Sequence, residues 1–170
     1  MSEAGAAASV SDPTAALITA LAARGLTIAV AESLTGGALA AELTRPAGAS
    51  AVVNGGVVVY ATAIKHSVVG VDAELLAEHG PVHADVARQL AERVRAVLAV
   101  EGRAADVGVS TTGVAGPAAQ GGQPVGTVFV GVAFGTSTRV QELHLDGGRA
   151  QIRAAAVTAA VDGIIAAAAE

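Results

Sequence analysis

The sequence contains no cysteine, very few aromatic side chains and little charge. Without cysteine, no disulfide, thiolate nucleophile or cysteine metal site is possible, which fits the reducing cytosol. Aromatic residues make up 2% of the 170 residues, namely Tyr60, Phe129 and Phe134. The hydrophobic share of 52% therefore rests mostly on Ala and Val, and the core must use small aliphatic side chains and close backbone packing. We expect a cytoplasmic protein.

Basic runs are also missing, and the formal net charge is −5. Nucleic-acid grooves need basic residues and, for single strands, stacking aromatic rings, so no nucleic-acid partner is expected. The four histidines show no metal-ligand spacing. We therefore expect no metal and no other cofactor.

Long apolar runs are absent as well. A membrane-spanning helix needs about 20 consecutive apolar residues, and the best candidates are broken at Arg24-Gly25 and Asp162-Gly163. The first twelve residues, MSEAGAAASVSD, lack the basic start and apolar centre of a signal peptide. We expect a disordered tail over residues 1–12, a single domain over residues 13–170, and no membrane association.

Strand and helix patterns alternate through the first two thirds of the chain, which favours parallel βαβ units. Apolar runs at 26–32 and 55–61 are typical of strands buried on both faces. Strands at 127–134 and 138–145 are joined by a short turn, so one of them must be antiparallel to its neighbours. The expected fold is α/β: a three-layer α/β/α sandwich with a mixed, mostly parallel five-stranded sheet containing one antiparallel strand.

Helix signals fill the gaps between the strands. Asp12-Pro13 resembles an N-cap followed by proline at the first helical position. Further helices are expected at about 36–43, 72–79, 84–99 and 149–168, with a short helical or irregular link over residues 62–70. The helix at 84–99 is amphipathic, with Val86, Leu90, Val94 and Val97 on one face.

Three polar segments follow predicted strands: ESLTGG, YATAIKH and STTGVAGPAAQGG. Ligands of open α/β sheets bind outside the carboxyl ends of the strands, so these segments are expected to converge. In ESLTGG, Ser33 stands beside backbone N–H groups that suit an oxyanion or a phosphate. The alternative is that Ser33 or Thr35 only caps the following helix.

Lys65, the only lysine, is the most promising base for Ser33. A serine hydroxyl needs a proton acceptor, and apolar surroundings lower the pKa of a lysine. Tyr60, five residues earlier, could relay or orient the proton. The alternative is a solvated lysine and a core tyrosine.

The loop GVAGPAAQGGQPVG is long enough to be a functional cradle or a flexible tether. Arg149 and Arg153 begin the last helix at i, i+4 and share one face. Arginine is unfavourable at a helix start because of the helix dipole, which favours either an anionic partner or a solvated surface.

The motifs AESLTGG, VVVYATAIKHSVVGV, HGPVHADVA, STTGVAGP and QPVGTVFVGVA occur in an order that resembles the CinA C-terminal domain family, which includes nicotinamide-nucleotide amidases. The resemblance covers about residues 14–168. It implies hydrolysis of nicotinamide mononucleotide to nicotinate mononucleotide and ammonia, with Ser33 as nucleophile, Lys65 as base and Tyr60 assisting. It also implies a homodimer and no metal.

On this reading the substrate is a pyridine mononucleotide. The backbone near Thr35 to Gly37 would hold the oxyanion, and the loop from Gly113 with Arg149 would hold the ribose phosphate. The expected substrate contacts are Glu32, Thr35, Gly36, Gly37, Thr62, Thr112, Gly113, Ala115, Gly116 and Arg149.

Two positions depart from the family pattern. Thr62 stands where relatives commonly have asparagine, and His83 stands where they often have serine. Both leave Ser33, Tyr60 and Lys65 intact. The alternative function is a CinA-like nucleotide-binding or regulatory module that turns over weakly or not at all.

Overall fold

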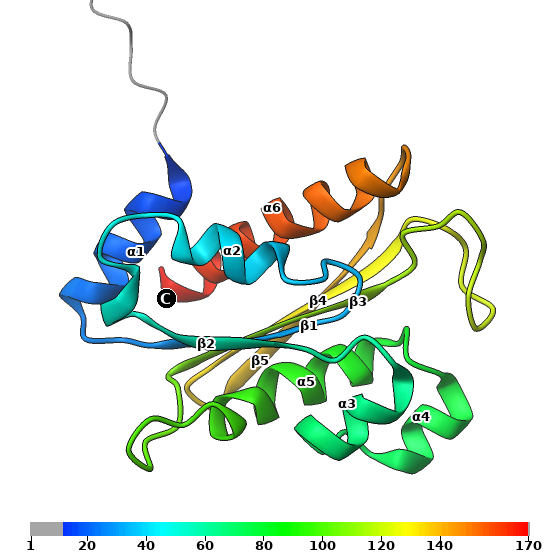
Figure 1. The fold of residues 1–170 in the computed structure, drawn as a ribbon, viewed down its shortest axis with the longest axis horizontal. Coiled ribbons are helices and arrows are strands. Elements are labelled where there is room, and N and C mark those ends of the chain that lie inside the picture. Colours follow the sequence, from blue (N-terminus) through cyan, green and yellow to red (C-terminus); the bar gives the residue numbers. More distant parts are fainter. Residues whose placement is uncertain (1–11, 170) are drawn as a thin grey trace, which may run out of the picture.

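The computed structural model describes residues 12–169, which build one five-stranded sheet. The strands are β1 (Ile28–Glu32), β2 (Val53–Val58), β3 (Val107–Gly113), β4 (Thr127–Phe134) and β5 (Ser137–His144). They lie in the order β2-β1-β3-β4-β5 (Figure 1). β1 pairs in parallel with β2 and β3, whereas β4 is antiparallel to both β3 and β5. β4 alone therefore runs against the other four, which confirms the predicted mixed sheet.

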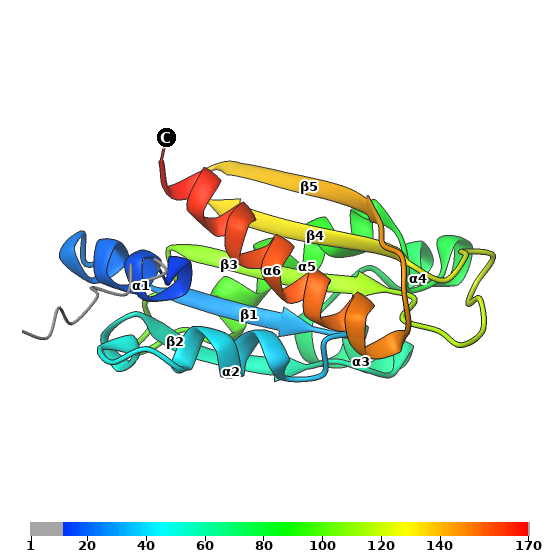
Figure 2. The ribbon, with the colours of Figure 1, turned by 90° about the horizontal axis from the view of Figure 1, so that it is seen from above.

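Helices cover both faces of the sheet, which confirms the three-layer sandwich. One face carries α1 (Pro13–Ala23), α2 (Ala38–Thr44) and α6 (Arg149–Ala168), as Figures 1 and 2 show. The other carries α3 (Thr62–Val69), α4 (Ala73–His79) and α5 (Ala84–Val97). A short 3-10 turn at Ala49–Ala51 precedes β2.

Several predicted boundaries and burial patterns need correction. β2 was expected to be buried on both faces, but it is an edge strand and its residues are only partly covered. α2 begins at Ala38, two residues later than expected, because Gly36 and Gly37 have φ angles of 61° and 97° that no right-handed helix allows. Val97 ends α5 and is 41% exposed, so it does not share the buried face.

The predicted tail lies outside the described residues, apart from Asp12. Asp12 is the N-cap of α1, as expected, and its carboxylate accepts a hydrogen bond from the Ala15 N–H at 3.0 Å. The same carboxylate pairs with both terminal nitrogens of Arg45, at 2.7 and 2.9 Å. Hydrogen bonds from Arg45 lower the pKa of Asp12 to about 2.

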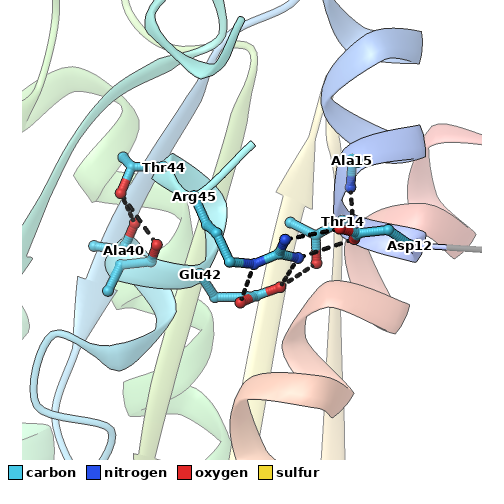
Figure 3. Close-up of polar contacts among 8 residues, drawn as sticks. Asp12, Thr14, Ala15, Ala40, Glu42, Thr44 and Arg45 are labelled. Atoms are coloured by element: carbon cyan, nitrogen blue, oxygen red, sulfur yellow. Dashed lines mark hydrogen bonds and ion pairs between the residues drawn. The ribbon is translucent and has the colours of Figure 1, made fainter. Parts of the chain in front are cut away.

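Glu42 completes this cluster between two helices (Figure 3). Its carboxylate accepts hydrogen bonds from Arg45 and from the Thr14 hydroxyl, the latter at 2.6 Å. The hydrogen bond from Arg45 holds the pKa of Glu42 below its ordinary value. The cluster of Asp12, Thr14, Glu42 and Arg45 therefore fastens the start of α1 to the C-terminal half of α2.

α6 is the one helix of the described residues that is long and apolar enough to cross a membrane, a test that core helices of other proteins also pass. In this structure it packs along the sheet (Figure 2). Ile152, Ala156, Ala160 and Ile164 are fully buried in the core between α6 and the strands. Packing therefore accounts for its apolar face.

Small side chains let helices approach the sheet closely, as the aromatic-poor composition predicted. At Gly108 of β3, an added Cβ would overlap the carbonyl oxygen of Ala91 in α5. At Gly56 of β2, it would come within 2.9 Å of the Ala40 Cβ in α2. Such contacts bring both helix layers close to the central strands.

We expect Gly108→Ala to destabilise the fold by about 3 kcal/mol, because the methyl group must displace the backbone of α5. Urea denaturation measures this loss. The control is Gly25→Ala, where an added Cβ meets nothing within 4 Å. Because Gly25 has a left-handed backbone conformation, Gly25→Ala should lower the free energy of unfolding by only about 1 kcal/mol. Equal losses in both variants would contradict the close packing of α5 on β3.

Candidate active site

Three loops converge at the carboxyl ends of β1, β2 and β3, as the parallel topology predicted. They line one pocket of about 80 Å³, which is room for several water molecules at roughly 10–15 Å³ each. The segments after β1 and β2 contribute Ser33 and Tyr60, α3 contributes Lys65, and the beginning of α6 contributes Arg149. The end of β3 contributes Thr112 and Gly113, and the loop after it contributes Ala115 and Gly116.

Ser33 and Lys65 are in direct contact. The Lys65 Nζ lies 3.0 Å from the Ser33 Oγ, and both side chains are buried, with Lys65 only 1% exposed. Lys65 also donates to the carbonyl oxygens of Val59, at 2.7 Å, and Tyr60, at 3.3 Å. Burial lowers the pKa of Lys65 to about 8.

These three contacts suit a neutral amine. A neutral amine has two N–H donors and one lone pair, and two carbonyl oxygens accept the two donors. The lone pair is then left for the hydroxyl of Ser33. Lys65 can therefore take the proton of Ser33 without any change of position.

The turn after β1 is fixed by hydrogen bonds that the sequence did not reveal. The Ser33 N–H lies 3.4 Å from the Thr111 Oγ1, and the hydroxyls of Thr35 and Thr111 are 2.8 Å apart. Arg153 donates to the carbonyl oxygens of Leu34, at 3.0 Å, and Thr35, at 2.8 Å. The guanidinium of Arg153 is thus committed to this turn rather than to a ligand.

Neither Ser33 nor Thr35 caps α2, so the capping alternative is wrong. The N-cap is Gly37, and the capping side chain is Glu32. One Glu32 oxygen accepts from the N–H groups of Gly37 and Leu39, at 3.0 and 3.1 Å, and the other accepts from Ala40 at 2.8 Å. Glu32 is fully buried and does not line the pocket, which corrects its expected substrate contact.

The predicted oxyanion donors also need correction. The Gly37 N–H is bonded to Glu32, and the Gly36 N–H donates to the Ser33 carbonyl oxygen at 3.1 Å. Thr35, Gly36 and Gly37 are absent from the pocket lining. These three residues shape the turn instead of contacting the pocket.

Tyr60 contacts Lys65 through its backbone rather than its ring. Its hydroxyl accepts a hydrogen bond from Arg149 at 3.0 Å, and Arg149 also donates to the Gly116 carbonyl oxygen at 2.8 Å. The Tyr60 side chain is 57% exposed. The predicted proton relay through the Tyr60 hydroxyl is therefore not matched by a contact with Lys65.

The two departures from the family pattern do not line the pocket. Thr62 is the exposed first residue of α3 and does not line the pocket, so its expected substrate contact stays a prediction. His83 is the N-cap of α5, where its Nδ1 accepts from the Asp85 N–H at 3.2 Å. Its ring stacks on His79 with centroids 4.6 Å apart. A histidine before an amphipathic helix could have indicated this cap.

These features define an α/β sandwich domain with a buried serine–lysine pair at the carboxyl edge of its sheet. The chain belongs to the CinA C-terminal domain family, which it matches over residues 11–168. It is 47% identical to a CinA-like protein of Frankia casuarinae over 139 residues, or 82% of this chain. The chain spans only 31% of the length of that relative.

Solved structures agree with this assignment. A CinA superfamily protein of Klebsiella pneumoniae 700603 superposes with a TM-score of 0.86 and 31% identity, covering 92% of this chain and 96% of that one. The competence/damage inducible protein CihA of Agrobacterium tumefaciens gives a TM-score of 0.81 and 33% identity, covering 94% and 98%.

Because Lys65 is the only lysine, protein labelled with [13C]lysine has a single side-chain Cε signal. We expect this signal to titrate near pH 8 in the native protein, because burial penalises the ammonium form, and near pH 10.5 in the unfolded chain. NMR titrations in buffer and in urea measure both midpoints. A native midpoint at or above 10.5 would contradict the buried, anion-free environment.

The same shift has a consequence for stability. Between pH 8 and 10.5 the unfolded chain holds the Lys65 proton and the native protein does not, so the free energy of unfolding rises with pH. Between pH 7 and pH 10.5, the free energy of unfolding of the wild type should rise by about 3 kcal/mol relative to that of Lys65→Met.

Proposed function

We propose that this protein hydrolyses the carboxamide of nicotinamide mononucleotide, releasing ammonia and nicotinate mononucleotide. The observation that carries the proposal is the 3.0 Å contact between Ser33 Oγ and Lys65 Nζ in a small pocket. The family resemblance of the motifs around Ser33 and Lys65 supports the choice of substrate.

The reaction is acyl transfer through Ser33. Lys65 takes the Ser33 proton, and Ser33 Oγ bonds to the carboxamide carbon to form a tetrahedral intermediate. Lys65 then returns the proton to the departing nitrogen, so that the C–N bond breaks and ammonia leaves. Water attacks the resulting ester, its proton passes through Lys65 to Ser33 Oγ, and the carboxylate product is released.

The oxyanion needs donors other than Gly36 and Gly37, whose N–H groups are already bonded. We assign the Leu34 N–H, which belongs to a pocket-lining residue and has no hydrogen-bond acceptor among residues 12–169. A donor in the residue after the nucleophile is well placed for a developing negative charge.

The ribose phosphate would lie at the rim of the pocket. A cavity of about 80 Å³ suits the carboxamide end of the ligand rather than the whole nucleotide. Arg149 lines the pocket, and its acceptors among residues 12–169 are both neutral: the Tyr60 hydroxyl and the Gly116 carbonyl oxygen. A phosphate would be a stronger partner for its guanidinium than either of these groups.

Active turnover is favoured over the alternative of a binding module without chemistry. The positions that depart from the family pattern, Thr62 and His83, do not line the pocket. They therefore leave the serine–lysine contact undisturbed. A homodimer and a cytoplasmic location remain predictions.

We expect Ser33→Ala to lower kcat for ammonia release from nicotinamide mononucleotide by at least about a thousandfold, because no nucleophile remains. A coupled ammonia assay measures the rate. The control is Ser67→Ala, which removes an exposed hydroxyl from α3 and should leave the rate unchanged. Equal rates for wild type and Ser33→Ala would refute the mechanism. Binding of the nucleotide without wild-type turnover would favour the binding module.

The pH dependence of kcat/KM should report on Lys65. Only the neutral amine accepts a proton, so kcat/KM should rise tenfold per pH unit below about 8 and level off above it. Lys65→Met should lower kcat/KM by at least about a hundredfold and abolish this rise. A wild-type profile that is flat from pH 6 to 9 would rule out Lys65 as the base.

A further inference from the structure

Glu32 is a buried carboxylate without a cationic partner. It is 0% exposed, and no ion pair of the described residues involves it. The two cations that bond to the turn after β1 and to Ser33 are otherwise engaged: Lys65 bonds to Ser33 and two carbonyl oxygens, and Arg153 bonds to the carbonyl oxygens of Leu34 and Thr35. A buried charge of this kind is costly unless hydrogen bonds compensate it.

The compensation comes from the beginning of α2. Glu32 accepts three charge-assisted hydrogen bonds, from the N–H groups of Gly37, Leu39 and Ala40. The first N–H groups of a helix have no acceptor within the helix, and the helix dipole favours a negative charge at this end. Glu32 therefore meets the hydrogen-bonding needs of α2, and α2 stabilises the charge of Glu32.

This arrangement fills a place that other proteins use for ligands. A strand, a glycine-rich turn and a helix start form the usual cradle for a phosphate. Here the carboxylate of Glu32 occupies that cradle from inside the protein. An anionic ligand group is consequently kept away from the helix start and must find its donors elsewhere in the pocket.

The same hydrogen bonds control where Ser33 lies. Ser33 directly follows Glu32, and the turn from Ser33 to Gly37 connects the strand to the helix that Glu32 holds. Arg153 fixes the carbonyl oxygens in the middle of this turn. With β1 at one end and the Glu32-bound helix at the other, the turn has little freedom to move Ser33 away from Lys65.

We propose that Glu32 is a positioning residue that, by holding the start of α2, keeps Ser33 Oγ within reach of Lys65 Nζ. The proposal rests on Ser33 being the nucleophile of the proposed function. It requires a carboxylate and not merely a side chain of the same shape. A carboxamide has one acceptor oxygen, and its own N–H groups would face backbone N–H groups that also donate.

The test compares Glu32→Gln with Glu42→Gln. Both substitutions remove a carboxylate that holds α2: Glu32 binds the start of the helix. Glu42 binds Thr14 and Arg45 toward its end, as Figure 3 shows. Both should lower stability, but only Glu32 lies next to the nucleophile. The control therefore separates a general loosening of α2 from a displacement of Ser33.

The main readout is the rate at which phenylmethylsulfonyl fluoride labels Ser33, followed by intact-protein mass at a temperature where each variant is folded by circular dichroism. This probe reports on the serine without depending on the proposed substrate. We expect Glu32→Gln to slow labelling by about a hundredfold, because a displacement of about 1 Å has that effect on a reacting group. Glu42→Gln should label within about twofold of wild type.

A second readout is the division between kcat and KM with nicotinamide mononucleotide. Glu32 does not line the pocket, so Glu32→Gln should lower kcat about as much as labelling and leave KM within about twofold. If Glu32→Gln does not fold, Glu32→Asp supplies the same comparison. It keeps the charge but places it one methylene group farther from the helix.

The outcomes separate the two proposals. Folded Glu32→Gln with wild-type labelling, or a change confined to KM, would overturn the positioning role. Equal slowing in Glu42→Gln would also overturn it. Wild type that is labelled at Ser33 but releases no ammonia would refute the proposed substrate and leave the role of Glu32 standing. Wild type that is not labelled at all would overturn the positioning role together with the nucleophile.

Discussion

A buried lysine without an anionic partner is the constraint on which the site depends. Lys65 is held by the carbonyl oxygens of Val59 and Tyr60 and by Ser33, and none of these groups carries a negative charge. Burial therefore favours the neutral amine and lowers its pKa to about 8. The end of β2 and the helix α3 must lie where they do, because a small shift would expose the amine and restore its basicity.

Small side chains make this placement possible. With three aromatic residues in the chain, the core between the layers consists mainly of Ala, Val, Leu and Ile side chains rather than rings. Gly108 lets α5 contact β3, and Gly56 lets α2 contact β2. Because the layers are close, the loops at the sheet edge meet around a pocket of only about 80 Å³. The amino-acid composition of the chain and the small volume of the pocket are thus linked through the packing of the layers.

Two carboxylates hold α2 in different ways. Glu42 forms part of a surface cluster in which Arg45 also binds Asp12 at the start of α1 (Figure 3). Glu32 pairs with no cation of residues 12–169 and relies on backbone N–H groups inside the protein. Surface ion pairs contribute little on average, whereas a buried carboxylate must be fully hydrogen-bonded or it destabilises the fold. Glu32 consequently constrains the turn that carries Ser33 more strongly than Glu42 does.

The sequence by itself determined the order of the strands and of most helices, the mixed sheet and the edge where the loops meet, because these follow from local periodicity and from the parallel topology. It offered Ser33 and Lys65 as candidates, and the family resemblance implied their pairing, but only the folded chain brings the two side chains to 3.0 Å. Only the tertiary structure decided the roles of Glu32, Tyr60, Arg153 and His83. Each of these side chains is polar and could have faced either a ligand or the protein's own backbone. Which one it satisfies depends on where distant carbonyl and N–H groups lie, and that information exists only once the chain has folded.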